Sequence, residues 1–333
     1  MIYGLVLRIR HLLYNKGWKK SFSAPIPTVC VGNITVGGTG KTPHVELLLR
    51  LLMAAGKQPA VLSRGYKRKL KGFQLVPADG TAALYGDEPA QIAHKFPNVP
   101  VAVDKDRVHG CEQLASKASC IVLDDAFQYR RLRATLNLVL VDYNRPIFKD
   151  RLLPWGRLRD LPQRLQAAQI VIVTKCPAEL SEEERAQWRQ DLKLSSEQPL
   201  FFTTLQYGAA QPVFLEADKH YLYAKQCTIL TGIANDAPLR SYLSNTYKIG
   251  QHLQFPDHHA YSKADLRTIT RAIQASGTSC LFTTEKDAQR LRDCKNVPSG
   301  IRERLFYLPI EAAFLTPEEQ AAFTTTLLTS TGR

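Results

Sequence analysis

Residues 27–42 read Pro-Thr-Val-Cys-Val-Gly-Asn-Ile-Thr-Val-Gly-Gly-Thr-Gly-Lys-Thr and contain the strongest motif in the chain. The β-branched run at 27–33 ends in Gly and Asn, which predicts a buried parallel strand. After Pro43, the sequence VELLLRLLMAAG keeps helical spacing, and Gly56 can end the helix. A strand, a glycine-rich loop, a Lys-Thr pair and a helix in this order are the context of a nucleotide-binding P-loop.

The loop is expected to bind the phosphates of a nucleotide. Its glycines let consecutive backbone N–H groups face phosphate oxygens, and the helix N-terminus adds its positive dipole. Lys41 is expected to reach the β- and γ-phosphates, and the Thr42 hydroxyl to ligate Mg²⁺. The usual first Gly of the motif is Thr35 here, and the alternative is a strand–helix turn without a ligand. The predicted nucleotide-binding residues are Thr35, Val36, Gly37, Gly38, Thr39, Gly40, Lys41 and Thr42.

Another predicted strand, which ends in two acidic residues, is expected beside this loop. Residues 120–125 read Cys-Ile-Val-Leu-Asp-Asp, an apolar strand that ends in two carboxylates. The carboxyl ends of parallel strands meet at the ligand-binding edge of a sheet. We therefore expect Asp124 and Asp125 to ligate Mg²⁺ directly or through water, with a helix cap as the alternative.

Apolar runs at 60–63, 99–103, 136–142 and 170–175 alternate with helical patterns or loops. This alternation predicts an α/β fold, with a mostly parallel P-loop NTPase-like sheet covered by helices on both faces and a smaller C-terminal α/β domain. The expected segments are an amphipathic helix at 1–20, a P-loop kinase domain at 21–205, a hairpin-like linker at 206–225 and the smaller domain at 226–333.

The first twenty residues, MIYGLVLRIRHLLYNKGWKK, are too short and too charged for a membrane-spanning helix. On a helix, one apolar stripe forms and basic residues flank it, a pattern that suits an anionic bilayer surface. The stripe consists of Ile2, Leu5, Val6, Ile9, Leu12 and Leu13. A helix packed on its own domain, with a solvated basic edge, is an equal alternative from this segment alone.

Composition limits the partners of the chain. The 333 residues carry a formal net charge of +14, so the surface attracts anions such as phosphates, nucleic acid or acidic lipid headgroups. The seven cysteines are scattered without a CxxC pair, which indicates reduced thiols rather than a disulfide framework or a zinc site.

Several strings together resemble one family, the tetraacyldisaccharide 4′-kinases of lipid A synthesis. In order they are GNITVGGTGKTP, LSRGY, YGDEP, LDDAFQY, LLPWGRLRD, TGIA, FPDHHAY and TTEKD, and they cover nearly the whole chain. The resemblance implies an enzyme that uses ATP and Mg²⁺ to phosphorylate the 4′-hydroxyl of an acylated glucosamine disaccharide 1-phosphate. It also implies attachment to the cytoplasmic face of the bacterial inner membrane, and no nucleic acid as partner.

The resemblance also assigns roles to residues that spacing alone would not single out. It implies that Asp87 accepts the proton of the sugar hydroxyl with the help of His258, and that Lys41 acts in catalysis. Arg64, Arg107 and Gln128 are implied as phosphate or substrate contacts. Without the resemblance, Asp87 is a helix cap and His258 a surface histidine. Lys286 is left open between a surface charge and a nucleotide contact.

The sequence departs from the family pattern at a few positions. Ala126 and Tyr129 replace the Gly and His of DDGFQH, and Trp155 and Asp160 replace the Ala and Glu of LPAGxLRE. These changes affect expected substrate contacts rather than the phosphate-binding core.

Two other classes compete with a kinase. In a P-loop GTPase or chaperone-like NTPase, the Thr-Lys-Cys-Pro at 174–177 would stand where guanine readers place Asn-Lys-x-Asp, but both the Asn and the Asp are missing. A basic nucleic-acid-binding protein would fit the net charge, but the chain has no zinc-finger spacing and no RNP-like aromatic string.

Overall fold

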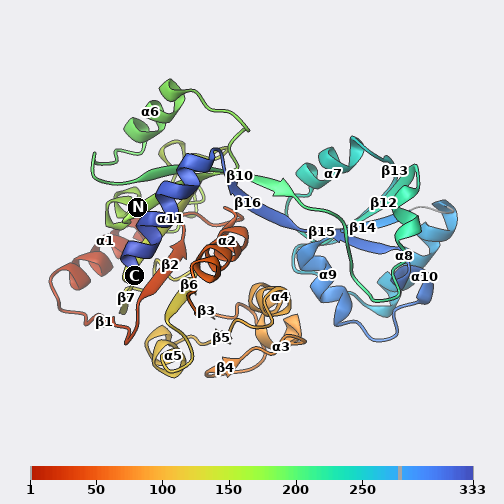
Figure 1. Ribbon diagram of the computed structural model, residues 1–333, viewed down its shortest axis with the longest axis horizontal. Coiled ribbons are helices and arrows are strands. Elements are labelled where there is room, and N and C mark those ends of the chain that lie inside the picture. The colour runs from red at the N-terminus through yellow and green to blue at the C-terminus, as the bar shows by residue number, and fades with distance from the viewer. Residues whose placement is uncertain (1, 277–279, 333) are drawn as a thin grey trace.

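The structure, a computed structural model, describes residues 2–276 and 280–332 in two α/β domains (Figure 1). Residues 1 and 333, which begin and end the expected segments 1–20 and 226–333, lie outside the described residues, as do residues 277–279. Strands β10 (Leu200–Tyr207) and β16 (Ile310–Phe314) run between the domains. Because they pair with each other, they determine which residues belong to which domain.

The first domain is built on a nine-stranded sheet, counted over the described residues. From one edge to the other, its strands are β16 (Ile310–Phe314), β10 (Leu200–Tyr207), β9 (Ile170–Thr174), β8 (Leu136–Asp142), β2 (Thr28–Gly32), β6 (Cys120–Asp124), β3 (Pro59–Ser63), β5 (Val101–Val103) and β4 (Gln74–Leu75). The seven central strands are parallel, and the two edge strands pair antiparallel with their neighbours. The predicted mostly parallel sheet is confirmed.

Helices cover both faces of this sheet. They are α1 (Ile2–Asn15), α2 (Lys41–Ala54), α3 (Ala82–Tyr85), α4 (Asp87–Lys95), α5 (Arg107–Leu114), α6 (Glu182–Asp191) and α11 (Pro317–Ser330), with short 3₁₀ turns η1 (Ile147–Lys149) and η2 (Pro162–Ala167). Strands β1 (Phe22–Ser23) and β7 (Leu132–Arg133) form a separate parallel pair.

Strand β2 shows how the sequence fits this arrangement. Val29 and Val31 pack into the core on the face of α2 and α11, where Phe323 is fully buried. Cys30 points to the opposite face and packs with Leu114 of α5. Because side chains alternate along a strand, a strand buried on both faces is apolar at nearly every position. The polar exception in β2 is Thr28, whose hydroxyl accepts a hydrogen bond from the Thr135 N–H at 3.0 Å.

The second domain has a five-stranded sheet within the described residues. Its strands, in order, are β11 (Gln211–Pro212), β15 (Leu305–Leu308), β14 (Cys280–Thr284), β12 (Gln226–Thr231) and β13 (Lys248–Gln254). The helices around it are η3 (Lys219–Tyr223), α7 (Ala237–Ser244), α8 (Lys263–Ser276), α9 (Glu285–Arg292) and α10 (Ser299–Arg302).

The division of the chain differs from the expected one. Residues 310–330 return to the first domain, where β16 pairs with β10 and α11 places Phe323 in the core. The expected hairpin at 206–225 is not a unit, because β10 pairs with β16 while β11 pairs with β15. The physical reason is Pro309, which separates β15 and β16 into different sheets, since proline cannot continue a strand ladder.

Candidate functional site

The P-loop lies at the centre of the first sheet, between β2 and α2. Strand β2 has β6 on one side and β8 on the other, so the loop sits where the strand order reverses, the usual ligand position in open α/β sheets. Gly40 caps α2 with φ 86°, a left-handed conformation that a residue with a side chain adopts only at a cost. Thr42 is buried in the first turn of α2. The predicted strand, loop and helix are therefore all present.

The acidic strand end lies beside this loop. Lys41 Nζ is 3.9 Å from Asp125 Oδ1, and Asp124 Oδ2 accepts a 3.0 Å hydrogen bond from Ser63. Burial, followed by the charges of Asp125 and Glu88, raises the pKa of Asp124 to about 6. Burial also lowers the pKa of Lys41, against the pull of Asp125. The site thus holds a buried carboxylate whose charge is poorly compensated by the protein alone.

Arg159 belongs to this site, although no role was predicted for it from the sequence. Its Nη1 donates to Asp125 Oδ2 at 3.0 Å, and its Nη2 contacts Asp125 Oδ1 and the side chain of Asn33. Asn33 Nδ2 in turn donates to the Thr39 hydroxyl at 2.8 Å. Burial would raise the pKa of Asp125, but Lys41 and Arg159 outweigh it and lower that pKa. In the sequence, Arg159 lies in the family string LLPWGRLRD, directly before the acidic Asp160.

The three implied substrate contacts have different surroundings. Arg107 is buried, donates to the carbonyl of Asp104 at 2.5 Å, and lies within the electrostatic field of Asp124. Arg64 is exposed after β3. Gln128 donates its amide to the Asn33 carbonyl at 2.7 Å, so its side chain supports the end of β2.

Asp87 and His258 come together from the two domains. His258 Nδ1 is 2.8 Å from Asp87 Oδ2, and Arg290 Nη2 donates to the same oxygen at 2.5 Å. Burial by itself would raise the pKa of Asp87, but the hydrogen bonds and charges of Arg290 and His258 outweigh burial and lower this pKa. The carboxylate is therefore ionised at neutral pH. Arg290, which follows TTEKD by three residues, was not predicted from the sequence.

Backbone geometry holds both members of this pair. Gly86, with φ 101°, precedes Asp87, and a Cβ at this glycine would lie 3.2 Å from Gly65 Cα, so the two loops approach closely. His258 has φ 61°, in the left-handed region, and its N–H donates to the Gly232 carbonyl at 3.3 Å. A non-glycine residue held in this conformation often marks a functional site.

Ion pairs between α4 and α9 join the domains next to Asp87. Lys286 Nζ is 2.6 Å from Glu88 Oε1, and Lys95 Nζ is 3.1 Å from Glu285 Oε1. Glu88 also contributes to the raised pKa of Asp124, and Lys286 to the lowered pKa of Lys41. The start of α4 therefore lies within electrostatic range of the P-loop, and Lys286 is a contact between domains.

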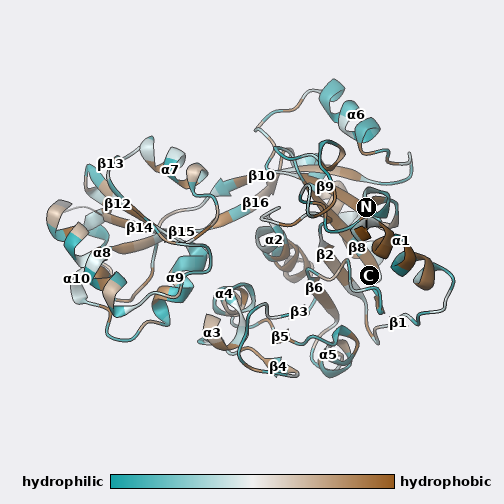
Figure 2. Cartoon of the chain, turned by 180° about the vertical axis from the view of Figure 1, so that it is seen from behind, coloured by the Kyte–Doolittle hydropathy of each residue, from teal (hydrophilic) through white to brown (hydrophobic). Residues whose placement is uncertain are grey.

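Helix α1 exposes the predicted apolar stripe. Ile2 is 82% exposed, and Leu5, Val6, Ile9 and Leu12 are each at least half exposed, whereas Leu7 and His11 are buried. Figure 2 shows α1 as a largely hydrophobic helix at the surface of the first domain. In the described part of the chain, no helix is both long and apolar enough to cross a bilayer.

The fold and the site define the class of the protein: a P-loop phosphotransferase with a carboxylate–histidine pair contributed by two domains. The family model described as tetraacyldisaccharide-1-P 4′-kinase (LpxK) matches residues 1–331. The chain therefore belongs to the tetraacyldisaccharide 4′-kinase family. The predicted family and fold class are confirmed, as are the kinase activity and the assignment to lipid A synthesis.

Individual relatives agree with the family model. The chain is 41% identical to a tetraacyldisaccharide 4′-kinase of Phocaeicola vulgatus over 336 residues, covering 96% of this chain and 90% of the relative. It is 42% identical to the kinase of Flavobacterium johnsoniae, covering 96% and 92%. A crystal structure of LpxK from Aquifex aeolicus in complex with ATP superposes with a TM-score of 0.76 at 28% identity, covering 98% of this chain and 95% of that one.

Proposed function

We propose that the protein transfers the γ-phosphate of ATP to the 4′-hydroxyl of an acylated glucosamine disaccharide 1-phosphate. The observation that carries the proposal is the Asp87–His258 pair, which is formed across the domain boundary, with the adjoining Glu88 within electrostatic range of the P-loop. The first domain then supplies the phosphate donor site and the proton acceptor Asp87, and the second domain supplies His258, which orients Asp87.

The residues around the P-loop suit ATP with Mg²⁺. Among the described residues, no group of three or more His, Cys, Asp and Glu side chains is placed to hold a metal by itself. Mg²⁺ needs no such cage, because it is commonly bound by one or two carboxylates together with substrate phosphates. Asp124 and Thr42 offer hard oxygen ligands, and Asp125, already held by Arg159, fits a role through water. Bound Mg²⁺ would neutralise charge on the transferred phosphoryl group.

Lys41 and Arg159 are two cations that lie beside Asp125 in the phosphate site. Lys41 lies at the start of α2, where the backbone N–H groups of the loop also face, and it would stabilise the charge of the terminal phosphates. Arg159 contacts Asp125 and can exchange part of that contact for a phosphate oxygen, because a guanidinium has five donors. Arg107 Nε, which has no hydrogen-bond partner among the described residues, lies close to the same carboxylates.

Asp87 is the proton acceptor in this proposal. A sugar hydroxyl is a weak acid, so a carboxylate within hydrogen-bond reach is needed to take its proton as the new P–O bond forms. His258 and Arg290 fix the Oδ2 oxygen of Asp87, which leaves Oδ1 to receive the proton. His258 orients the carboxylate through its Nδ1. Its other ring nitrogen, Nε2, does not contact Asp87 and can therefore transfer a proton.

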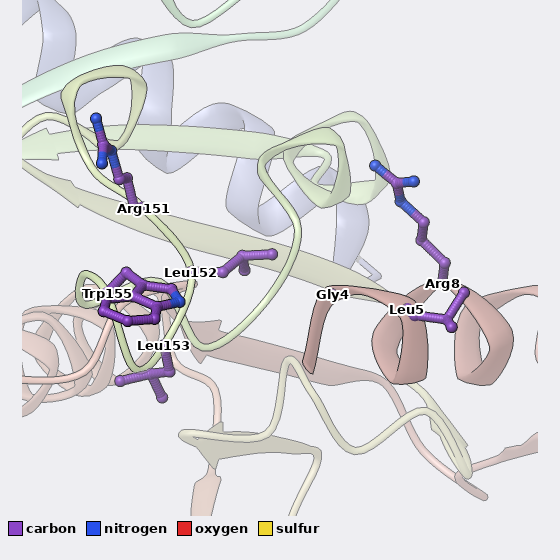
Figure 3. A pocket seen from close by; sticks show the side chains of 7 residues that line it. All are labelled: Gly4, Leu5, Arg8, Arg151, Leu152, Leu153 and Trp155. Atoms are coloured by element: carbon purple, nitrogen blue, oxygen red, sulfur yellow. The ribbon is translucent and has the colours of Figure 1, made fainter. Parts of the chain in front are cut away.

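The exposed stripe of α1 supports attachment to an anionic membrane surface, at the cytoplasmic face of the inner membrane. An open pocket of about 640 Å³ lies between α1 and the loop that carries Trp155 (Figure 3). Leu5 and Arg8 line it from α1, and Arg151 and Trp155 line it from the loop. Apolar side chains flanked by arginines match the boundary between acyl chains and anionic headgroups.

The test is phosphate transfer from labelled ATP with Mg²⁺ to a tetraacyl disaccharide 1-phosphate in detergent micelles. The wild type should yield the 1,4′-bisphosphate lipid, and both Lys41→Ala and Asp87→Ala should lose this product. If the protein hydrolyses ATP but leaves the lipid unchanged, the assignment of the P-loop as an ATP site is kept and the assignment of the disaccharide lipid as the phosphate acceptor is refuted.

A further inference from the structure

The buried side of α1 holds the loop that ends in Arg159. The Tyr3 hydroxyl donates to the Arg159 carbonyl at 2.8 Å, and His11 Nε2 is 2.6 Å from Asp160 Oδ1. These two contacts lie on either side of the peptide bond between Arg159 and Asp160. The helix thus fixes the backbone at the residue whose guanidinium reaches Asp125.

The same loop pairs with the first residues of the P-loop. Val36 N–H donates to the Arg157 carbonyl at 2.8 Å, and Arg159 N–H donates to the Ile34 carbonyl at 2.8 Å. Thr35 and Leu158 form an isolated antiparallel bridge between them. A shift of residues 157–160 would therefore move both the start of the phosphate-binding loop and the Arg159 side chain.

The contact between His11 and Asp160 is buried and specific. Asp160 is fully buried, and its Oδ1 accepts from His11 and from the Leu161 N–H at 2.9 Å, while its Oδ2 has no hydrogen-bond partner among the described residues. Arg130 Nη1 lies 3.3 Å from His11 Nδ1 and donates to the His11 carbonyl at 3.0 Å. Nδ1 is thus the acceptor, and the proton on Nε2 is directed at Asp160.

A helix that only attached the enzyme to lipid would not need this contact. The apolar stripe faces away from the domain, whereas a histidine and a carboxylate are buried beneath it, where a pair of apolar side chains would pack at less desolvation cost. The polar pair gives a directed contact where an apolar pair would give only packing.

We propose that His11 is a positioning residue for phosphoryl transfer. Acting through Asp160, it sets the backbone at residues 157–160, which places Arg159 and the first P-loop residues for the phosphates of ATP. Helix α1 is then part of the phosphate site as well as a membrane-facing element. The inference rests on the proposed use of ATP.

The test compares His11→Leu with His11→Gln, because a glutamine amide can still donate to Asp160 and a leucine cannot. For each variant, we would measure kcat and KM for ATP in detergent micelles, the ATP dissociation constant by calorimetry, and the thermal unfolding midpoint. Assays are run well below that midpoint. We expect His11→Leu to lower kcat/KM for ATP about tenfold, with KM for the lipid unchanged, and His11→Gln to stay within threefold of the wild type.

Val6→Gln is the matched control, because Val6 lies on the same helix and is 54% exposed. It should keep the kinetic constants for ATP in micelles and bind less well to vesicles that contain an anionic phospholipid, whereas His11→Leu should bind these vesicles normally. The proposal is overturned if His11→Leu keeps kcat/KM for ATP within twofold, or if His11→Gln is as impaired as His11→Leu.

Two further arms keep the result decisive. If His11→Leu does not fold, His11→Met takes its place, because methionine also cannot donate a hydrogen bond to Asp160. The expected loss of kcat/KM for ATP and the result that overturns the proposal stay the same. If the wild type binds ATP but leaves the lipid unphosphorylated, the proposed function fails, while ATP binding by the two His11 variants still decides the inference.

Discussion

The phosphate-binding region and the Asp87 region are built in different ways. The first takes its residues from neighbouring strand ends and loops of one sheet, so Lys41, Thr42 and Asp124 are placed by a single domain. The second joins Asp87 of α4 to His258 and Arg290 of the other domain. Phosphate binding therefore depends on the fold of the first domain, whereas proton transfer also depends on how the two domains are held together.

The largest effect is expected inside the first region. Lys41→Ala should lower kcat/KM for phosphoryl transfer about 10³-fold, because it removes a positive charge aimed at the transferred phosphate. Labelled-ATP assays in micelles would measure it. Lys117→Ala removes an exposed lysine of the same domain and serves as the control. A loss smaller than tenfold in Lys41→Ala would contradict the assignment.

A change in the second region should affect chemistry without affecting nucleotide binding. Asp87→Asn should lower kcat about 10²- to 10³-fold and leave the ATP dissociation constant within threefold, because the amide keeps the shape and loses the base. The control is Asp79→Asn, at an exposed acid. If ATP binding weakened in parallel with kcat, the two regions would not be separable in this way.

The stability of the phosphate-binding region should depend on pH through Asp124. Its pKa of about 6 lies above the ordinary aspartate value of 3.8, so the folded state favours the protonated form. The stability that this provides is present below pH 3.8 and is lost as pH rises through 6. Asp124→Asn should therefore be more stable than the wild type at pH 8, by at most about 3 kcal/mol, and not at pH 4.

Urea unfolding without Mg²⁺ or nucleotide would measure this difference at each pH. The same variant should transfer phosphate about 10²-fold more slowly, since a metal ligand is lost. Parallel stability–pH curves for the two proteins would show that the buried carboxylate is compensated in the folded state.

The smallest effect is expected at the ion pair between the domains. Lys286→Met breaks the contact with Glu88, and both side chains are partly exposed, so stability should change by less than about 1 kcal/mol. We expect a two- to fivefold loss of kcat/KM, because the domains are held less firmly around Asp87. Glu88→Gln should behave alike, and the double variant no worse than either. If the losses of kcat/KM in the two single variants add up in the double variant, Lys286 acts independently of Glu88, as expected for a direct contact with the nucleotide.

Sequence reasoning succeeded where the determinants are local. The strand, glycine loop, Lys41 and helix follow one another in the chain, and β2 to α2 appear as expected. Asp87 and His258 depended on the family resemblance, because their contact joins residues 171 positions apart. Arg159 and Arg290 were missed for the same reason: an arginine acquires its role from what it reaches in three dimensions. The return of residues 310–330 to the first sheet depends on long-range pairing that no local pattern carries.

Because β10 pairs with β16, the second domain could be removed from this protein without breaking the first sheet. Gly208 N–H donates to the Pro309 carbonyl at 2.9 Å, so the chain leaves the first domain and re-enters it at the same point. The second domain is thus an insertion between two adjacent strands. A short turn joining residues 208 and 309 would close the gap and yield a shorter, uninterrupted P-loop protein. Such a miniature would retain Lys41, Asp124 and Arg159 and lose His258 and Arg290, which separates nucleotide recognition from acceptor activation in a single molecule.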